Sequence, residues 1–164
     1  MKSQKIATGG LISALSLLFL YLCSVVPSGK IAMICISSFC IGLCVALINI
    51  KFSLIAFFVV SILGLILLPN KVIPFLFMLF FGNYPIAKLF LEKITNVYLM
   101  WLVKIFVFNI YAVVTYFMVT RFIDVEINFA VPIIILIANF AYVIYDFAFS
   151  IFVTKILEIR RKKL

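Results

Sequence analysis

Six long apolar runs, separated by short polar breaks, decide what this chain can fold into. They cover about residues 6–26, 31–50, 52–68, 72–91, 96–120 and 129–157. A helix needs about 20 apolar residues to cross the hydrocarbon core of a bilayer, and each run approaches or exceeds that length. The chain is 68% hydrophobic and 12% charged, which is too apolar for a soluble domain of this size. The pattern predicts an all-α fold: one polytopic membrane domain over 1–164, a bundle of six transmembrane helices.

The breaks between the runs differ in strength. Those at 27–30 and 69–71 contain proline, which ends helices for backbone reasons. The break at 49–51 is the weakest, because only Asn49 and Lys51 mark it. Read as one helix, residues 31–68 would span about 57 Å, which is too long for one bilayer. A tight hairpin is therefore predicted at this break.

The fourth run contains a helix-breaking sequence, Gly82-Asn83-Tyr84-Pro85. Pro85 has no N–H to donate to the carbonyl of Phe81, so a kink is expected there. Broken helices in transporters expose backbone groups to a cavity, whereas an ordinary kink serves only packing. The sequence leaves both interpretations open.

The distribution of basic residues predicts the orientation. Six crossings put both termini on one side of the membrane. With the N-terminus inside, the inner side holds ten basic residues: Lys2, Lys5, Lys51, Lys88, Lys93, Lys155, Arg160, Arg161, Lys162 and Lys163. The outer side holds three, namely Lys30, Lys71 and Arg121. Since cytoplasmic loops carry the excess of Lys and Arg, we expect a multi-pass protein of the cell membrane with both termini in the cytoplasm.

The composition argues against most catalytic and cofactor chemistry. The chain has no histidine and five acidic residues, with no glycine-rich phosphate loop and no metal-ligand cluster. We therefore expect no enzyme activity, no metal and no other cofactor. Cys40 and Cys44 share a helical face and could form a soft-metal or redox pair, but buried free thiols are the simpler interpretation. The net charge of +9 lies at the ends of apolar runs, which fits the lipid bilayer rather than nucleic acid.

Two charged residues, Lys104 and Asp146, lie inside the last two apolar runs. The position midway between them, 125, is the centre of the polar link at 121–128, so antiparallel helices would place both at one depth. At about 100° per residue, Lys104 shares a stripe with Tyr111 and Thr115. The stripe on the other run consists of Asn139, Tyr142, Asp146 and Ser150. Because an unpaired charge in lipid is costly, we predict an intramembrane ion pair between Lys104 and Asp146.

The same two stripes offer a candidate ligand-binding site. Its side chains for hydrogen bonding or stacking are Tyr111, Thr115, Tyr116, Asn139 and Tyr142. A few polar groups in an apolar, aromatic setting are typical of a site for a small-molecule solute. The alternative is that these residues bond the helices to each other, with about 1 kcal/mol or less from each bond. Collection of the residues onto two facing stripes favours the site.

Small residues gather near the start of the first run. Gly9 with Ser13, and Gly10 with Ala14, are spaced four apart. Such pairs let another helix backbone approach closely, which drives helix association in membranes. Gly10 and Ala14 are therefore candidate partner-docking residues, and packing inside the protein is the alternative.

The whole chain resembles the substrate-binding S subunits of energy-coupling-factor vitamin transporters. The shared features are its compact size, six predicted helices, both termini on the inner side and small residues near the start of the first helix. In that family an AxxxA pattern on the first helix meets the transmembrane T subunit, and Gly10-Leu11-Ile12-Ser13-Ala14 matches it loosely. The resemblance implies a vitamin-like solute bound near the outer side of helices four to six, and partnership with a T subunit and an ATPase module. Pro27–Lys30 is short for the lid of that family. A membrane scaffold of the MreD type, which organises envelope machinery, has similar size and topology and is the alternative function.

Overall fold

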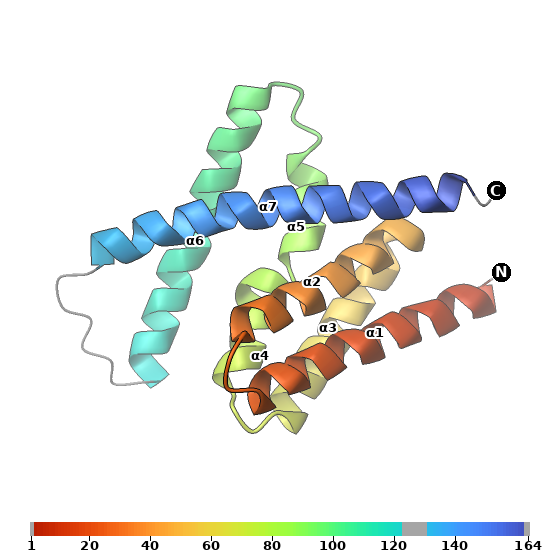
Figure 1. Cartoon of the computed structure of the whole chain (residues 1–164), viewed down its shortest axis with the longest axis horizontal. Helices are drawn as coiled ribbons and strands as arrows, with labels where there is room; N and C mark the ends of the chain where they lie inside the picture. The colour runs from red at the N-terminus through yellow and green to blue at the C-terminus, as the bar shows by residue number, and fades with distance from the viewer. Residues whose placement is uncertain (1, 123–130, 163–164) are drawn as a thin grey trace. The chain divides into compact units, whose positions relative to one another are not determined.

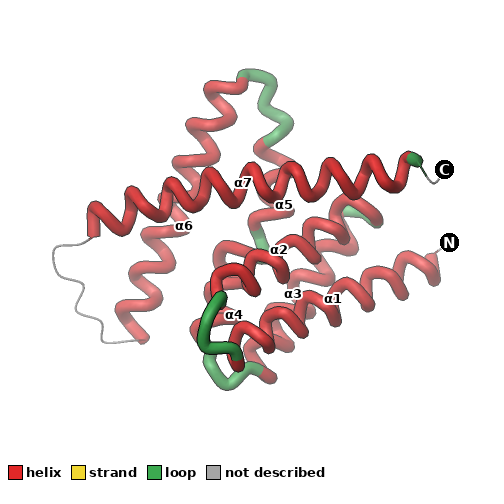
Figure 2. Tube along the Cα trace, in the orientation of Figure 1, coloured by secondary structure: helices red, strands yellow, loops and turns green. Residues whose placement is uncertain are grey.

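The computed structural model describes residues 2–122 and 131–162, and within them the fold is entirely helical (Figures 1 and 2). The elements are α1 (Lys2–Val25), α2 (Lys30–Leu47), α3 (Ile50–Leu67), α4 (Val72–Leu76), η1 (Phe77–Phe81), α5 (Tyr84–Leu91), α6 (Val97–Phe122) and α7 (Val131–Arg161). Six spans in this part of the chain are long and apolar enough to cross a membrane, with α4, η1 and α5 forming the fourth. The predicted six-span all-α fold is confirmed, and the protein is a multi-pass membrane protein. The cytoplasmic placement of the termini stays a prediction.

The chain divides into two compact units. Unit 1 consists of Met1–Leu89 with Ile151–Leu164, and unit 2 of Phe90–Ser150. In unit 1, α1, α2 and α3 pack on one another with α4 and η1 against them. Unit 2 contains α6 and the first part of α7, which cross each other (Figure 1).

Hydroxyl groups join α1 to α2 inside unit 1. Ser16 Oγ donates to the Ser37 carbonyl at 3.0 Å, and Ser37 Oγ donates to the Ser16 carbonyl at 2.9 Å. Both residues are fully buried. Each hydroxyl thus uses a carbonyl of the opposite helix as its acceptor, which offsets the cost of placing it in an apolar core. The four cysteines are free thiols, and Cys40 and Cys44 lie in this core.

Short turns connect the first three helices. α2 ends at Leu47 and α3 begins at Ile50, so the tight hairpin predicted at the weakest break is present. The turn before α2 needs Gly29, whose φ of 77° is left-handed. Beyond α3, Lys71 Nζ donates to the carbonyls of Leu65 at 2.7 Å and Leu68 at 2.8 Å. A cation bonded to the last carbonyls of a helix stabilises its C-terminus.

The fourth span is broken where the sequence predicts a kink. One turn of π-helix, Phe77–Phe81, ends with the Gly82 N–H donating to the Phe77 carbonyl at 2.7 Å. The Phe81 carbonyl, to which Pro85 cannot donate, accepts a hydrogen bond from Ser38 Oγ of α2. A Cβ at Gly82 would lie 2.6 Å from the Phe77 ring and 2.8 Å from the Phe57 ring. The break is therefore packed and bonded within unit 1, as an ordinary structural kink would be.

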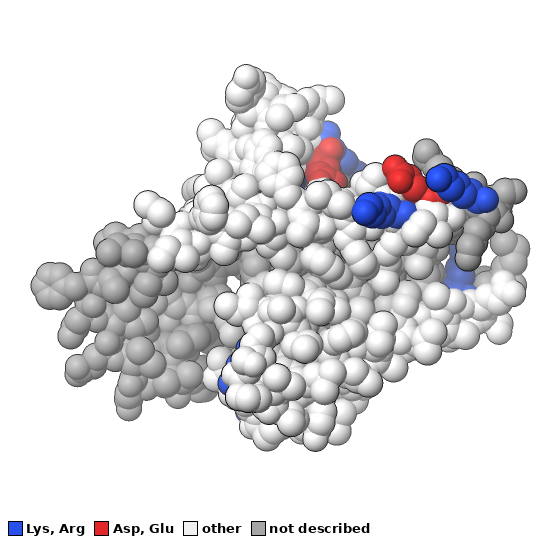
Figure 3. Space-filling model, viewed as in Figure 1, with Lys and Arg blue, Asp and Glu red and all other residues white. Residues whose placement is uncertain are grey.

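The surface is largely uncharged. On the face drawn in Figure 3, charged side chains gather in a few places and most of the visible surface carries none. Many large apolar side chains are exposed on the membrane-spanning helices, including Leu11, Ile31, Ile66 and Leu102. Apolar exposure on this scale suits contact with lipid rather than water.

Candidate functional site

A buried ion pair lies where α6 and α7 cross. Lys104 Nζ donates to Asp146 Oδ2 at 2.9 Å, and the exposed fractions of the two side chains are 2% and 3%. The register of the two apolar runs predicts this contact, and the structure brings the two residues together. Ser150 Oγ donates to the Asp146 carbonyl at 2.9 Å, so this member of the predicted stripe bonds within α7.

A second carboxylate completes the cluster. Glu92 Oε1, in the turn between α5 and α6, lies 3.7 Å from Lys104 Nζ, and the Glu92 side chain is 44% exposed. Lys104 Nζ also lies 5.1 Å from the centre of the Trp101 ring. We call Glu92, Trp101, Lys104 and Asp146 the charge cluster. Its ammonium is held between a buried carboxylate and an exposed one, beside an aromatic face that attracts cations.

Local structure explains how Glu92 reaches the cluster. Asn96 begins α6: its Oδ1 accepts from the N–H of Tyr98 at 3.1 Å. Lys104 is seven residues into α6, about 10 Å from its first residue. Side chains on a helix point toward its N-terminus, and long basic side chains bury their stems and extend their charge toward an interface. Sequence reasoning missed Glu92, although the direction of the Lys104 side chain was an available signal.

Two asparagines form a second polar contact between α6 and α7. Asn109 Nδ2 donates to Asn139 Oδ1 at 3.0 Å, and Asn139 Nδ2 donates to Asn109 Oδ1 at 3.2 Å. The same amides donate within their own helices, to the carbonyls of Ile105 and Ile135. Asn109 was missed from the sequence, which put only Tyr111 and Thr115 on the stripe of Lys104. The helices cross, so the contacts gather around the crossing and include a residue off the predicted stripe.

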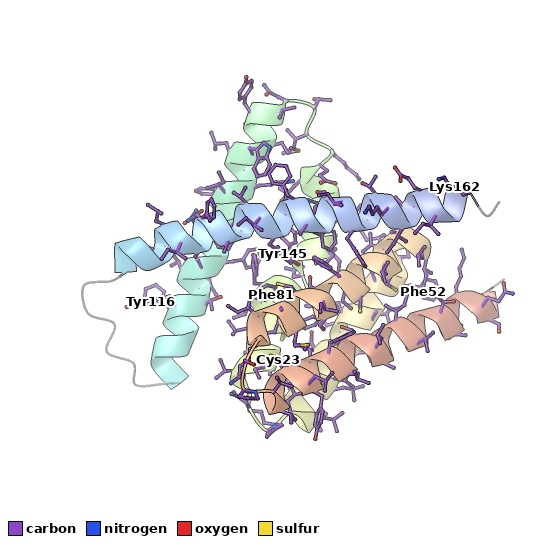
Figure 4. All side chains as sticks on the ribbon, in the orientation of Figure 1. Cys23, Phe52, Phe81, Tyr116, Tyr145 and Lys162 are labelled. Carbon is purple, nitrogen blue, oxygen red and sulfur yellow. The ribbon has the colours of Figure 1, made fainter. Side chains whose placement is uncertain are left out.

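The other predicted ligand residues occupy different surroundings. Tyr142 is buried and stacks on Phe108, with ring centres 4.4 Å apart. Tyr111 and Thr115 are half-buried. Tyr116 is 41% exposed and lies on α6 away from its crossing with α7 (Figure 4). A role for these residues in ligand binding stays a prediction. Asn139 and Tyr142 both contact α6 across the crossing.

The predicted docking residues lie along a groove in unit 1. Gly10 and Ala14 are exposed and, with Gly9 and Ser13, line a groove between α1 and α3. No atom of the described residues outside the local helix lies within 4 Å of a Cβ built on Gly10. Gly9 by contrast lies against Ile48, whose Cδ1 would be 3.7 Å from such a Cβ. This arrangement favours an external contact at Gly10 over packing inside the unit.

Comparison with known proteins adds no relative. No protein-family model matches the chain, and neither a curated protein nor a solved structure matches it significantly.

Proposed function

We propose that this protein is the small-solute-binding subunit of an energy-coupled uptake transporter. The polar part of its solute site is the charge cluster, which the predicted orientation places nearer the cytoplasmic side than the outer-side site of the family that the chain resembles. The observation that carries the proposal is a lysine ammonium buried in a membrane-spanning helix and held between two carboxylates. Ionisable residues inside a membrane are costly and commonly mark solute or ion pathways. Binding, rather than catalysis, is the role we assign.

The energetics of the pair support a role beyond stability. A buried ion pair gains about as much from attraction as it loses from desolvation, and well-packed apolar residues are often as stable in its place. A scaffold helix would therefore gain little from Lys104 and Asp146. The reciprocal amide pair of Asn109 and Asn139 already joins the same two helices. The charged residues are better explained by a ligand that needs them.

The distances indicate the class of solute. Lys104 contacts Asp146 at hydrogen-bond distance, but Glu92 at 3.7 Å lies beyond it and is partly exposed. Of the two carboxylates, Glu92 is the farther from the ammonium and the more exposed, so it is the one that a solute would displace. An acidic group of a solute would take its place beside Lys104, with an apolar or aromatic body against Trp101. We therefore propose a small, vitamin-like acid as the solute.

Energised uptake needs partners, because the sequence contains no glycine-rich phosphate loop that would bind ATP. The partners implied by the family resemblance are a T subunit and an ATPase module. The exposed positions of Gly10 and Ala14 are compatible with docking of such a subunit. A scaffold of the MreD type would also present an open helix face, so that face does not separate the two functions.

Purification from native membrane tests the proposal. We expect an ATPase module and a T subunit to accompany the wild-type chain, and mass spectrometry to find an acidic small molecule bound to it. A folded Lys104→Met/Asp146→Leu variant should keep the protein partners and lose the small molecule. Co-purification of cell-wall enzymes without any small molecule would instead establish the scaffold function.

A further inference from the structure

The groove between α1 and α3 is a feature that the solute site does not use. It has a volume of about 580 Å³ and extends from Ile6 to Leu17 on α1 and from Phe52 to Leu63 on α3. The two helices run in the same direction, since Gly9 packs near Ile48 and Leu20 packs near Gly64. The N-terminal parts of α1 and α3 therefore form one end of the groove, and more C-terminal parts of both helices form the other.

The dimensions of the groove restrict its occupant. Eleven residue steps on each helix correspond to about 17 Å, close to the roughly 15 Å depth of one leaflet. An extended hydrocarbon chain of one leaflet can therefore lie along the whole length of the groove.

The chemistry of the lining points the same way. Its lining is mostly aliphatic and aromatic, with three small residues of α1, Gly9, Gly10 and Ala14. The lining hydroxyl of Ser13 donates to the Gly9 carbonyl at 2.8 Å, so its proton is already engaged. Polar groups along an occupant would find few hydrogen-bond partners here, and an alkyl chain needs none.

Basic residues stand at one end of the groove. Lys5 and Lys51 directly precede the first lining residues, Ile6 of α1 and Phe52 of α3, and both lysines are exposed. Because α1 and α3 start at the same end, two ammonium groups are available where a hydrocarbon chain in the groove would reach the interface. Lysine near an anionic headgroup contributes about 1 kcal/mol.

We propose that this groove binds one acyl chain of an anionic phospholipid, whose headgroup lies between Lys5 and Lys51. The lipid belongs to the leaflet in which α1 begins. Small residues of α1 line the groove because larger side chains there would occupy the path of the acyl chain. This inference does not depend on the proposed solute site, but it assigns Gly10 and Ala14 to a lipid rather than to a docked subunit.

Retention of defined lipids by the purified full chain tests the proposal. The two probes are dioleoyl phosphatidylglycerol and dioleoyl phosphatidylcholine, which share acyl chains and differ in headgroup charge. Native mass spectrometry of the protein released from mixed nanodiscs should show preferential retention of phosphatidylglycerol. Lys5→Gln and Lys51→Gln should each lower that preference about fivefold, the factor that corresponds to about 1 kcal/mol.

A filling variant tests the acyl path. Gly10→Leu places a side chain in the groove without a clash, because a Cβ at this position meets open space. It should reduce retention of both lipids severalfold while thermal stability is unchanged or higher. Ala7→Leu is the matched control, because Ala7 is an exposed small residue of α1 that does not line the groove.

Two results would overturn the proposal. Equal lipid retention by Gly10→Leu and Ala7→Leu would show that no acyl chain occupies the groove. Loss of a co-purifying membrane protein from Gly10→Leu, with lipid retention unchanged, would assign the groove to a partner helix whose side chains enter it.

Discussion

Replacing Lys104 and replacing Asp146 should lower the free energy of unfolding by different amounts. Removing one partner of a buried ion pair commonly costs about 3–5 kcal/mol, and Lys104→Met should fall in that range because the Asp146 carboxylate is only 3% exposed. Asp146→Leu should cost about 1 kcal/mol less, since Glu92 remains 3.7 Å from the ammonium as a partly exposed counter-charge. The asymmetry follows from the second carboxylate.

The double variant removes both charges and should recover most of the loss. Apolar pairs of similar volume are often as stable as a buried ion pair, so we expect a coupling energy of about 2–3 kcal/mol between the two positions. Glu92→Gln alone should change stability by about 1 kcal/mol or less, because Glu92 is exposed. In the Asp146→Leu background Glu92→Gln should cost more, since Glu92 is then the carboxylate of the charge cluster that remains to balance the Lys104 ammonium.

Unfolding by sodium dodecyl sulfate in mixed micelles measures these free energies. The single tryptophan of the chain is Trp101, whose ring centre lies 5.1 Å from Lys104 Nζ, so its fluorescence reports directly on the charge cluster. Additive losses in the double variant would refute the reasoning, because they would mean that the two side chains do not interact. Equal losses in the two single variants would refute the part assigned to Glu92.

Four further substitutions test the packing of the broken span and the second polar contact by the same unfolding assay. Gly82→Ala should cost about 1–3 kcal/mol, because its Cβ would press on two phenylalanine rings, and near-neutral stability would contradict that packing. Ser38→Ala removes the hydroxyl donor from the Phe81 carbonyl and should cost about 1–3 kcal/mol, with Ser24→Ala, a buried hydroxyl without a described partner, as the neutral control. Asn109→Leu and Asn139→Leu should show a coupling of about 1 kcal/mol, and no coupling would mean that the amides do not bond.

The spans and breaks could be predicted because they depend on local chemistry. Bilayer thickness fixes how many apolar residues each span needs, and this separates α2 from α3 where only Asn49 and Lys51 mark the turn. The contact of Lys104 with Asp146 could be predicted because two runs joined by a short link share a midpoint. These inferences use distances along the chain, and the backbone geometry of helices converts them to depth.

The remaining contacts depend on how helices cross, which periodicity does not determine. Asn109 lies off the stripe of Lys104, so only the crossing brings its amide to Asn139. Glu92 lies in a break between two apolar runs. Its approach to Lys104 could have been predicted only by considering that the Lys104 side chain points toward the start of its helix. Pro85 explains why the Phe81 carbonyl lacks its backbone donor. The π-helical turn and the hydrogen bond from Ser38 to that carbonyl depend instead on packing against α2.

The two polar contacts between α6 and α7 differ in what they leave for a ligand. In the amide pair, Asn109 and Asn139 each place a donor on the other and a second donor on their own helix, so every N–H of both side chains is used. A solute could enter there only by breaking these bonds, at a cost that a new contact must exceed. Glu92, by contrast, stands beyond hydrogen-bond distance from Lys104, and its side chain is 44% exposed. Under the proposed function a solute acid would replace Glu92 while the buried pair with Asp146 stays intact, which is why we propose the charges rather than the amides as the site.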